Sequence, residues 1–185
     1  REQNLNKLSS YVSGSAEWTG RILIQKPRVT LSLRSDLNGL SLRFPAPLNK
    51  GADQLISLRL DKRQDNNSDH IFINYGNKIS AKIARITENN KPRLQSADIR
   101  FNSDSPYSEN DIELTADNRS AGIALSGKLD YLDADAWRYV LKNLGSDNKQ
   151  GMPITIKRTA LDIDALDIFD RRINQLKISN IANKN

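Results

Sequence analysis

Cysteine is absent from this chain of 185 residues, and histidine occurs only once, as His70. The lack of cysteine excludes a disulfide framework, a cysteine nucleophile and a zinc site built from thiolates. A single histidine also argues against a catalytic triad or a zinc centre, because both need a histidine with suitable partners. We interpret His70 as a structural or solvated residue, and we expect no cofactor, no metal ion and no enzymatic activity.

Long apolar stretches and large aromatic anchors are also scarce. Hydrophobic residues make up 37% of the chain and aromatic residues 6%, and the mean hydropathy is -0.62. No apolar run approaches the roughly 20 residues that a membrane-spanning helix needs, and no signal peptide opens the chain. We expect the chain to be an internal segment of a longer protein, with any targeting or anchoring segment outside it.

Charge is distributed unevenly along the chain. Residues 1–100 contain 17 basic and 9 acidic residues, whereas residues 101–185 contain 11 and 13. A basic surface can attract anionic lipid headgroups or nucleic acid. Here the basic residues are spread singly, without the interleaved aromatic residues on which single-stranded nucleic acids stack. We therefore expect a solvated polar face and no nucleic-acid partner.

Apolar and polar residues alternate along many short stretches, which is the pattern of strands with one apolar face. About ten such strands in hairpin order predict a mainly β protein with an antiparallel sheet. A sheet with one apolar face needs a cover, and the sequence offers a single short helix for it. We therefore expect a curled sheet, a β-groove, whose apolar side meets either itself or an apolar guest.

The stretch from Ser35 to Leu60 organises this pattern. It contains two alternating apolar runs, at 40–44 and 56–60, joined by the segment PAPLNKG. Proline lacks a backbone donor and holds the chain extended, so the joining segment cannot lie inside a sheet. The polar residues 61–69 predict a surface loop, and Gly20 predicts a bulge or a bend in an early strand.

One helix is predicted, over residues 133–145. Asp133 would cap its first turn and Gly145 would end it. Four apolar residues recur at helical spacing and would form one buried stripe: Trp137, Val140, Leu141 and Leu144. The predicted layout is a main antiparallel sheet over residues 14–132, the helix, and further strands over residues 152–181, with a hairpin at residues 112–125.

Candidate catalytic and metal-binding groups are few. Asp130, Asp133 and Asp135 form a cluster of carboxylates, but the EF-hand spacing is missing and helix capping accounts for two of the three. No phosphate-binding loop, dinucleotide fingerprint or nucleophile elbow occurs. Trp18 and Trp137 are interpreted as core anchors rather than as platforms for carbohydrate. The sequence therefore predicts no catalytic residue and no metal ligand.

The segment SDLNGLSLRFPAPLNK, residues 35–50, resembles the hallmark of the YhdP family, large AsmA-like proteins of Gram-negative bacteria. In that family a Ser-Asp-Leu-x-Gly turn precedes a strand that ends in Pro-x-Pro-Leu-x-Lys. The matching positions in this chain are Ser35, Asp36, Leu37, Gly39, Pro45, Pro47, Leu48 and Lys50.

Flanking segments follow the same family order. Residues 14–20 are similar to a small-residue lead-in to a strand with a tryptophan, and residues 127–133 are similar to the segment before a helix with a tryptophan. The tail at 161–169 resembles a repeated segment that ends in a Phe-Gly turn, with Asp170 standing here in place of that glycine. The resemblance covers most of residues 14–178.

The resemblance implies a long periplasmic β-groove, anchored to the inner membrane by a segment outside this chain, and it brings no catalytic residues. It also implies that the groove shields or conducts phospholipid acyl chains between the inner and outer membranes and supports the outer-membrane permeability barrier. The expected partners are phospholipid acyl chains and, through the full-length protein, both membranes. Burial of an acyl chain is favourable by about 25 cal/mol per Å² of apolar surface. The side chains expected to line the groove are Val29, Leu31, Leu33, Leu40, Leu42, Phe44, Ile56, Leu58, Leu60, Ile99, Phe101, Ile123 and Leu125.

Two other classes of protein stay open at this point. A closed β-sandwich or jelly roll, used as a structural or glycan-binding module, would have two packed sheets and no trough. A hydrolase on a β scaffold would need catalytic groups that the sequence does not offer. These classes of protein differ in how much of the apolar side of the sheet is covered by other parts of the protein.

Overall fold

The computed structural model describes residues 7–88, 91–108, 122–144 and 156–181. Eleven strands and a helix, α2, make up this part of the chain. In chain order they are β1 (Val12–Gly14), β2 (Thr19–Gln25), β3 (Arg28–Ser35), β4 (Leu40–Leu42), β5 (Leu58–Gln64), β6 (Ser68–Tyr75), β7 (Ile79–Glu88), β8 (Lys91–Phe101), β9 (Gly122–Asp133), α2 (Ala134–Leu144), β10 (Ile156–Ile168) and β11 (Arg171–Ile181).

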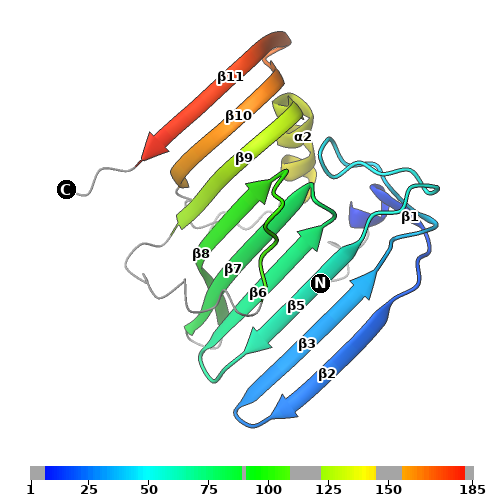
Figure 1. The fold of residues 1–185 in the computed structure, drawn as a ribbon, viewed down its shortest axis with the longest axis vertical. Helices are drawn as coiled ribbons and strands as arrows, with labels where there is room; N and C mark the ends of the chain where they lie inside the picture. The colour runs from blue at the N-terminus through cyan, green and yellow to red at the C-terminus, as the bar shows by residue number, and fades with distance from the viewer. Residues whose placement is uncertain (1–6, 89–90, 109–121, 145–155, 182–185) are drawn as a thin grey trace.

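Nine of these strands form one open sheet, in the order β11-β10-β9-β8-β7-β6-β5-β3-β2 (Figure 1). The mainly β fold class with one short helix is confirmed. The strands do not all run antiparallel as expected, because β9 pairs parallel with β8 and β10 pairs parallel with β9. A parallel neighbour needs a crossover connection, and α2 lies in the one between β9 and β10. The hairpin predicted at residues 112–125 falls mostly outside the described residues.

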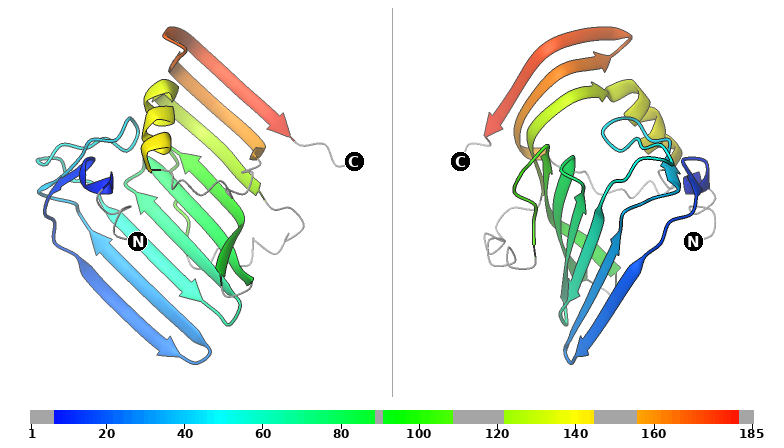
Figure 2. Two further views of the ribbon diagram at one scale, coloured as in Figure 1. Left: turned by 180° about the vertical axis from the view of Figure 1, so that it is seen from behind. Right: turned by 45° about the vertical axis from the view of Figure 1, so that its right-hand side comes forward.

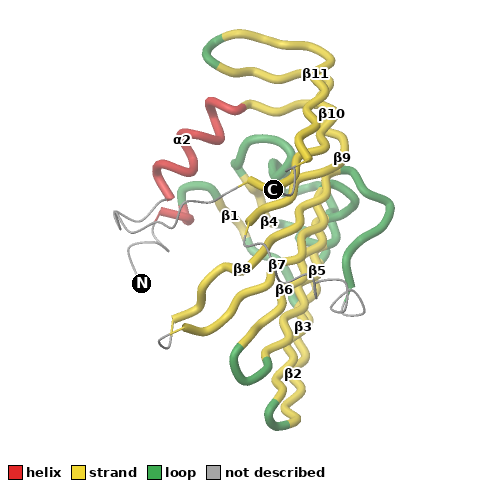
Figure 3. Tube along the Cα trace, turned by 90° about the vertical axis from the view of Figure 1, so that its left-hand side faces the viewer, coloured by secondary structure: helices red, strands yellow, loops and turns green. Residues whose placement is uncertain are grey.

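The sheet is curled rather than flat. The right view of Figure 2 shows β9, β10 and β11 arching away from the plane of the earlier strands. Seen from its edge in Figure 3, the sheet has α2 on one side and the loop after β8 on the other. Hydrogen-bonded pairing stops at β2 and at β11 within the described residues, so the sheet does not close into a barrel.

Two predictions about the early strands are wrong. Residues 61–69 are not a loop, because β5 continues to Gln64 and β6 begins at Ser68. Charged residues can continue a strand whose second face is polar, and here Asp61 is buried on that face. Gly20 causes no bulge, since it pairs in register with Leu33. A Cβ at Gly20 would lie 3.1 Å from Leu33 Cδ2, so the glycine makes room for that side chain.

The best-packed apolar cluster lies at the curled end of the sheet, on β9 and β10. Leu129, Leu161, Ile163 and Leu166 are buried there, and part-buried residues such as Phe101 and Leu125 pack against them. The curl brings these strands toward α2 (Figure 2), and Ala134 at the start of α2 packs against the cluster. The other end of the same sheet has no comparable cluster among the described residues, because Ile22 and Ile24 on β2 are 67% and 66% exposed.

The Asp133 cap of the helix is confirmed, because Asp133 Oδ1 accepts a hydrogen bond from the Ala136 backbone N–H at 2.8 Å. Val140 is buried and Trp137 is part-buried. Leu141 was expected in the same buried stripe, but it is 63% exposed. The buried side of α2 is therefore narrower than the apolar stripe predicted from the sequence, and Leu141 lies outside it.

Candidate functional site

One face of the nine-stranded sheet is almost wholly apolar. Residues that face each other across neighbouring strands point to the same side, and the register aligns them in rows. The central row runs across six strands as Leu33, Leu60, Ile73, Ala81, Ile99 and Leu125. A second row, toward the end of the sheet near Tyr75, contains Leu58, Tyr75, Ile79, Phe101 and Leu161. We call this side of the sheet the apolar face.

From β3 to β8 the large aliphatic side chains of the apolar face are not fully buried, in contrast to the cluster on β9 and β10. In the middle of the sheet Leu60, Ile73, Ile83 and Ile99 all keep some exposure, and only the small residues Ala81 and Ala97 and the ring of Tyr75 are buried. Within the described residues, the one other sheet is the short pair of β1 and β4, and no second layer packs across this face. The two packed layers that a closed sandwich requires are therefore not found in this part of the chain.

Nine of the thirteen predicted lining residues lie on the apolar face. By register these are Val29, Leu31, Leu33, Leu58, Leu60, Ile99, Phe101, Ile123 and Leu125. The other four lie outside the nine-stranded sheet. Leu40 and Leu42 belong to β4, which pairs with β1, and Phe44 and Ile56 lie in the segment between β4 and β5.

Sequence reasoning missed several residues of the apolar face, chiefly on β2, β6 and β7. The missed side chains include Ile22, Ile24, Ile71, Ile73, Ile79 and Ile83. Strict alternation marked β7 as a strand, so Ile79 and Ile83 could have been found. In β6 the signal is weaker, because Phe72 interrupts the alternation by lying on the opposite face.

The opposite face is polar in composition, yet in the middle of the sheet, on β5, β6 and β7, it is the better buried of the two. Phe72 is 0% exposed there, Asp61 1%, Lys82 5% and Ser80 4%. The loop after β8 packs on this face: the Tyr107 backbone N–H donates to Ser80 Oγ at 2.8 Å, and Asn74 Nδ2 donates to the Tyr107 carbonyl at 2.8 Å. Burial raises the pKa of the Tyr107 hydroxyl. We call this side the polar face.

An end cap closes one end of the apolar face. It comprises β1, residues 36–57 with β4, and α2. Tyr75 on the apolar face donates through its hydroxyl to the Leu48 carbonyl at 3.3 Å, and Trp137 Nε1 on α2 donates to the Ala46 carbonyl at 2.7 Å. Phe44 stacks between Tyr11 and Trp137. Burial raises the pKa of Tyr75 to about 12, so its hydroxyl stays a donor at neutral pH.

The hallmark residues 35–50 build this end cap. Lys50 is buried, and its Nζ donates to the carbonyls of Leu40 at 2.7 Å and Gly51 at 2.8 Å. Ser35 Oγ donates to the Glu17 carbonyl and accepts from the Leu37 N–H. Gly39 has a φ of +81°, and a Cβ there would lie 2.7 Å from the Ser15 carbonyl oxygen, so only glycine fits. The motif is thus explained by structure rather than by chemistry at an exposed group.

The other end of the apolar face carries charge. Gln64, Asp69 and Arg85 align in one row, and Lys62 lies one position closer to the centre. Arg85 donates from Nε to Asp69 Oδ1 at 2.7 Å and from Nη2 to Asp69 Oδ2 at 2.6 Å. Lys62 Nζ lies 3.4 Å from Asp69 Oδ2. Burial would raise the pKa of Asp69, but the hydrogen bond and charge of Arg85, together with Lys62, outweigh it and hold that pKa below its ordinary value.

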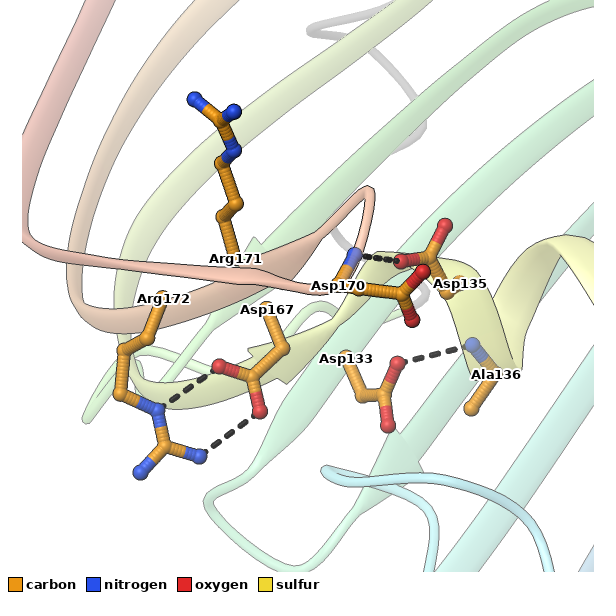
Figure 4. A pocket seen from close by; sticks show the side chains of 7 residues that line it. All are labelled: Asp133, Asp135, Ala136, Asp167, Asp170, Arg171 and Arg172. Atoms are coloured by element: carbon orange, nitrogen blue, oxygen red, sulfur yellow. Dashed lines mark hydrogen bonds and ion pairs between the residues drawn. The ribbon is translucent and has the colours of Figure 1, made fainter.

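A pocket of about 560 Å³ lies where α2 meets the β10–β11 hairpin, and it is lined by four aspartates and two arginines (Figure 4). Three of the four carboxylates have structural partners. Asp167 accepts two bonds of 2.7 Å from Arg172, which lower its pKa to about 2 together with a hydrogen bond from Tyr131. Asp135 accepts from the Asp170 backbone N–H at 3.3 Å. Within the described residues no group of acidic, histidine or cysteine side chains has the arrangement to hold a metal ion.

Asp170 occupies the position where the family pattern has glycine. Phe169 and Asp170 have φ values of 52° and 57°, and the strands pair directly on either side at Ile168 and Arg171. Two successive left-handed residues make the tight turn that suits the twist of a hairpin, and aspartate tolerates that conformation. The turn therefore forms without the glycine.

The remaining sequence candidates have structural places. His70 lies on the polar face, and burial, helped by the charges of Lys82 and Arg63, lowers its pKa. Trp137 anchors the end cap as expected, but Trp18 is 49% exposed. Trp18 comes just before β2, which has a neighbour on only one side in the described sheet, so less of the chain is available to cover it.

A curled open sheet with a part-exposed apolar face, capped at one end, defines a groove-forming β protein. The family model described as YhdP protein matches residues 1–184, and the chain therefore belongs to the YhdP family. A search of curated proteins and a search of solved structures each gave no match.

Family membership suggests AsmA-like lipid transport in general, with lipid-related partners, and a membrane-associated periplasmic protein. Among the residues that the structure describes, no helix combines the length and the apolar character needed to cross a membrane.

Proposed function

We propose that this chain is a periplasmic segment that shields or conducts phospholipid acyl chains between the inner and outer membranes and so supports the outer-membrane permeability barrier. The observation that carries the proposal is the apolar face from β3 to β8, whose large aliphatic side chains stay part-exposed although the polar face of the middle strands β5, β6 and β7 is largely buried. An acyl chain laid on that face would lose apolar contact with water, at about 25 cal/mol per Å².

The chemistry of the face suits this guest. Acyl chains carry no hydrogen-bonding groups, so aliphatic side chains can bind them without any specific arrangement of hydrogen-bond donors and acceptors. The central row presents Leu33, Leu60, Ile73 and Ile99 along neighbouring strands. The proposal includes no catalytic step and no cofactor, and the anchor in the inner membrane would be supplied by another part of the protein.

Native mass spectrometry of the gently purified chain tests the proposal. We expect mass adducts that correspond to co-purified phospholipid. The matched variants are Ile22→Asp with Ile24→Asp, on the apolar face of β2, and Leu23→Asp with Gln25→Asp, on the other face of the same strand. All four positions are exposed, so both variants should fold.

We expect the first pair to reduce the phospholipid adduct and the second pair to leave it unchanged. Bare protein across several preparations would overturn the proposal. An equal loss of lipid in both variants would also contradict it, because the guest would then not distinguish the two faces.

A further inference from the structure

A group of ionisable side chains lies on the apolar face of the three middle strands, at the end away from the end cap. Lys62, Asp69 and Arg85 point to the same side as the aliphatic residues of β5, β6 and β7. Two cations against one carboxylate give this trio a formal charge of +1. A charged group at the edge of an aliphatic surface is costly unless it is paired or meets a polar partner, so its place on this face needs an explanation.

The carboxylate fixes the two cations but does not use all their donors. Arg85 contacts Asp69 through Nε and Nη2, in the fork arrangement, which leaves Nη1 outside that pair. The contacts of Lys62 are long, at 3.4 Å to Asp69 Oδ2 and 3.3 Å to Gln64 Oε1. The side chains of Lys62 and Arg85 are each 30% exposed, whereas that of Asp69 is 12% exposed. Donors therefore remain on the accessible side of the trio.

We propose that Lys62 and Arg85, held in position by Asp69, bind the phosphate of an anionic lipid headgroup. Phosphate oxygens accept charge-assisted hydrogen bonds from both guanidinium and ammonium groups. With its Nε and Nη2 held by Asp69, Arg85 would offer Nη1 to the phosphate, and Lys62 would add its point charge. The trio stays partly solvated, so the headgroup need not leave water completely. This assignment rests on the proposed function, because it places the head of the same lipid whose chains cover the apolar face.

The distance from the trio to the end cap fits one lipid. Asp69 and Tyr75 begin and end the apolar side of β6, and six residues of strand span about 20 Å. The acyl chains of one leaflet occupy about half of the ~30 Å hydrocarbon core of a bilayer. The side chains along that path are Ile71, Ile73 and Tyr75. A lipid would thus lie with its phosphate at Lys62 and Arg85 and its chain ends toward Leu48 of the end cap.

The test compares a neutral version of the trio with a neutral version of a matched group on the polar face. The first variant is Lys62→Gln, Asp69→Asn and Arg85→Gln, which removes the charges but keeps amide groups that can hydrogen-bond. The control is Lys128→Gln, Asp164→Asn and Lys177→Gln, which makes the same change of charge at exposed ion pairs on β9, β10 and β11. Each protein is titrated with phosphatidylglycerol and with diacylglycerol of identical acyl chains, and circular dichroism confirms the fold.

We expect the native chain and the control to prefer phosphatidylglycerol by about tenfold, the size expected for charge-assisted hydrogen bonds that are partly exposed to water. The neutral trio should bind the two lipids equally while keeping its affinity for diacylglycerol. The preference of the native chain should shrink as salt is raised. Inorganic phosphate at the same concentration should not displace the lipid.

Any one of four results would overturn the assignment. A neutral trio that still prefers phosphatidylglycerol would show that Lys62 and Arg85 do not read the headgroup. Displacement by inorganic phosphate would show a site for free anions. Equal binding of both lipids to the native chain would contradict the headgroup site but not the proposed lipid-binding function of the apolar face. Binding of neither lipid would contradict both.

Discussion

In the middle of the sheet, the two faces have the reverse of the burial that their composition suggests, whereas on β9 and β10 the apolar residues are buried as expected. Asp61, Phe72 and Lys82 are buried on the polar face, whereas Leu60, Ile73 and Ile83 on the apolar face stay part-exposed. In a closed domain the aliphatic face would be the one packed away. The difference is what a proposed lipid guest on the apolar face would explain, because the described residues cover the polar side of the middle strands better than the apolar side.

The largest expected effect on stability is at Phe72, on the polar face. Phe72→Ala should lower the free energy of unfolding by about 3 kcal/mol, because it empties a fully buried site. Ile73→Ala, the next residue on the opposite face, should cost about half as much, since its side chain is part-exposed and its loss leaves no closed cavity. Urea denaturation of both variants measures the difference. Equal losses would mean that the apolar face is ordinary core.

The end cap provides the second test, because it joins the apolar face to α2. Lys50→Met keeps the length of the side chain but leaves the Leu40 and Gly51 carbonyls without their donor. Unfolding should become easier by about 2 kcal/mol. Lys142→Met, on the exposed side of α2, is the control and should change stability little. An unchanged free energy of unfolding in Lys50→Met would show that the buried ammonium group does not stabilise the end cap.

A smaller effect is expected at the contact between α2 and the PAPLNKG segment. Trp137→Phe keeps the stacking on Phe44 but removes the hydrogen bond to the Ala46 carbonyl. We expect a loss of about 1 kcal/mol in the free energy of unfolding. Tryptophan fluorescence of the native chain reports on the same contact during unfolding. If the variant is as stable as the native chain, the hydrogen bond from Trp137 to Ala46 does not contribute to the stability of the end cap.

The smallest effect is a pH dependence that belongs to the polar face. Burial lowers the pKa of His70 below its ordinary value of 6.5, so between those two values the unfolded chain binds more protons than the folded chain. The contribution of His70 to stability should therefore be complete above pH 6.5 and should be lost as the pH falls below 6.5 and through the pKa of the folded state. His70→Gln should flatten the stability curve between about pH 7.5 and 5.5, as urea midpoints would show. An unchanged slope would place the titrating group elsewhere.

The sequence predicts the fold class well because alternation is a local signal. Leu31 and Leu33 on β3 follow it strictly, as do Ile99 and Phe101 on β8, and the register places all four on the apolar face. The same signal cannot show which strand is the neighbour in space. The apolar residues of β4 alternate like sheet residues, yet they pair with β1, because tertiary pairing and not periodicity decides the partner.

Other features could not be predicted because they depend on contacts distant in sequence. Asp61 looks like a loop residue in the sequence, but it lies in β5 opposite Phe72 and is buried on the polar face. The parallel pairing of β9 depends on connections whose path is not encoded in either strand. The ion pair between Asp69 and Arg85 joins residues that are 16 positions apart, so no short motif marks it. The hallmark at residues 35–50 is visible in the sequence, but its role in building the end cap is not.

The absence of cysteine allows the central claim to be tested with single introduced labels. Leu31→Cys and Thr30→Cys place a fluorophore at neighbouring positions of β3, on the apolar and the polar face respectively. A phospholipid with a nitroxide on its acyl chain is then added to each labelled protein. We expect strong quenching of the fluorophore at residue 31 and little quenching of the fluorophore at residue 30. Equal quenching at both positions, or none at residue 31, would contradict a lipid guest on the apolar face.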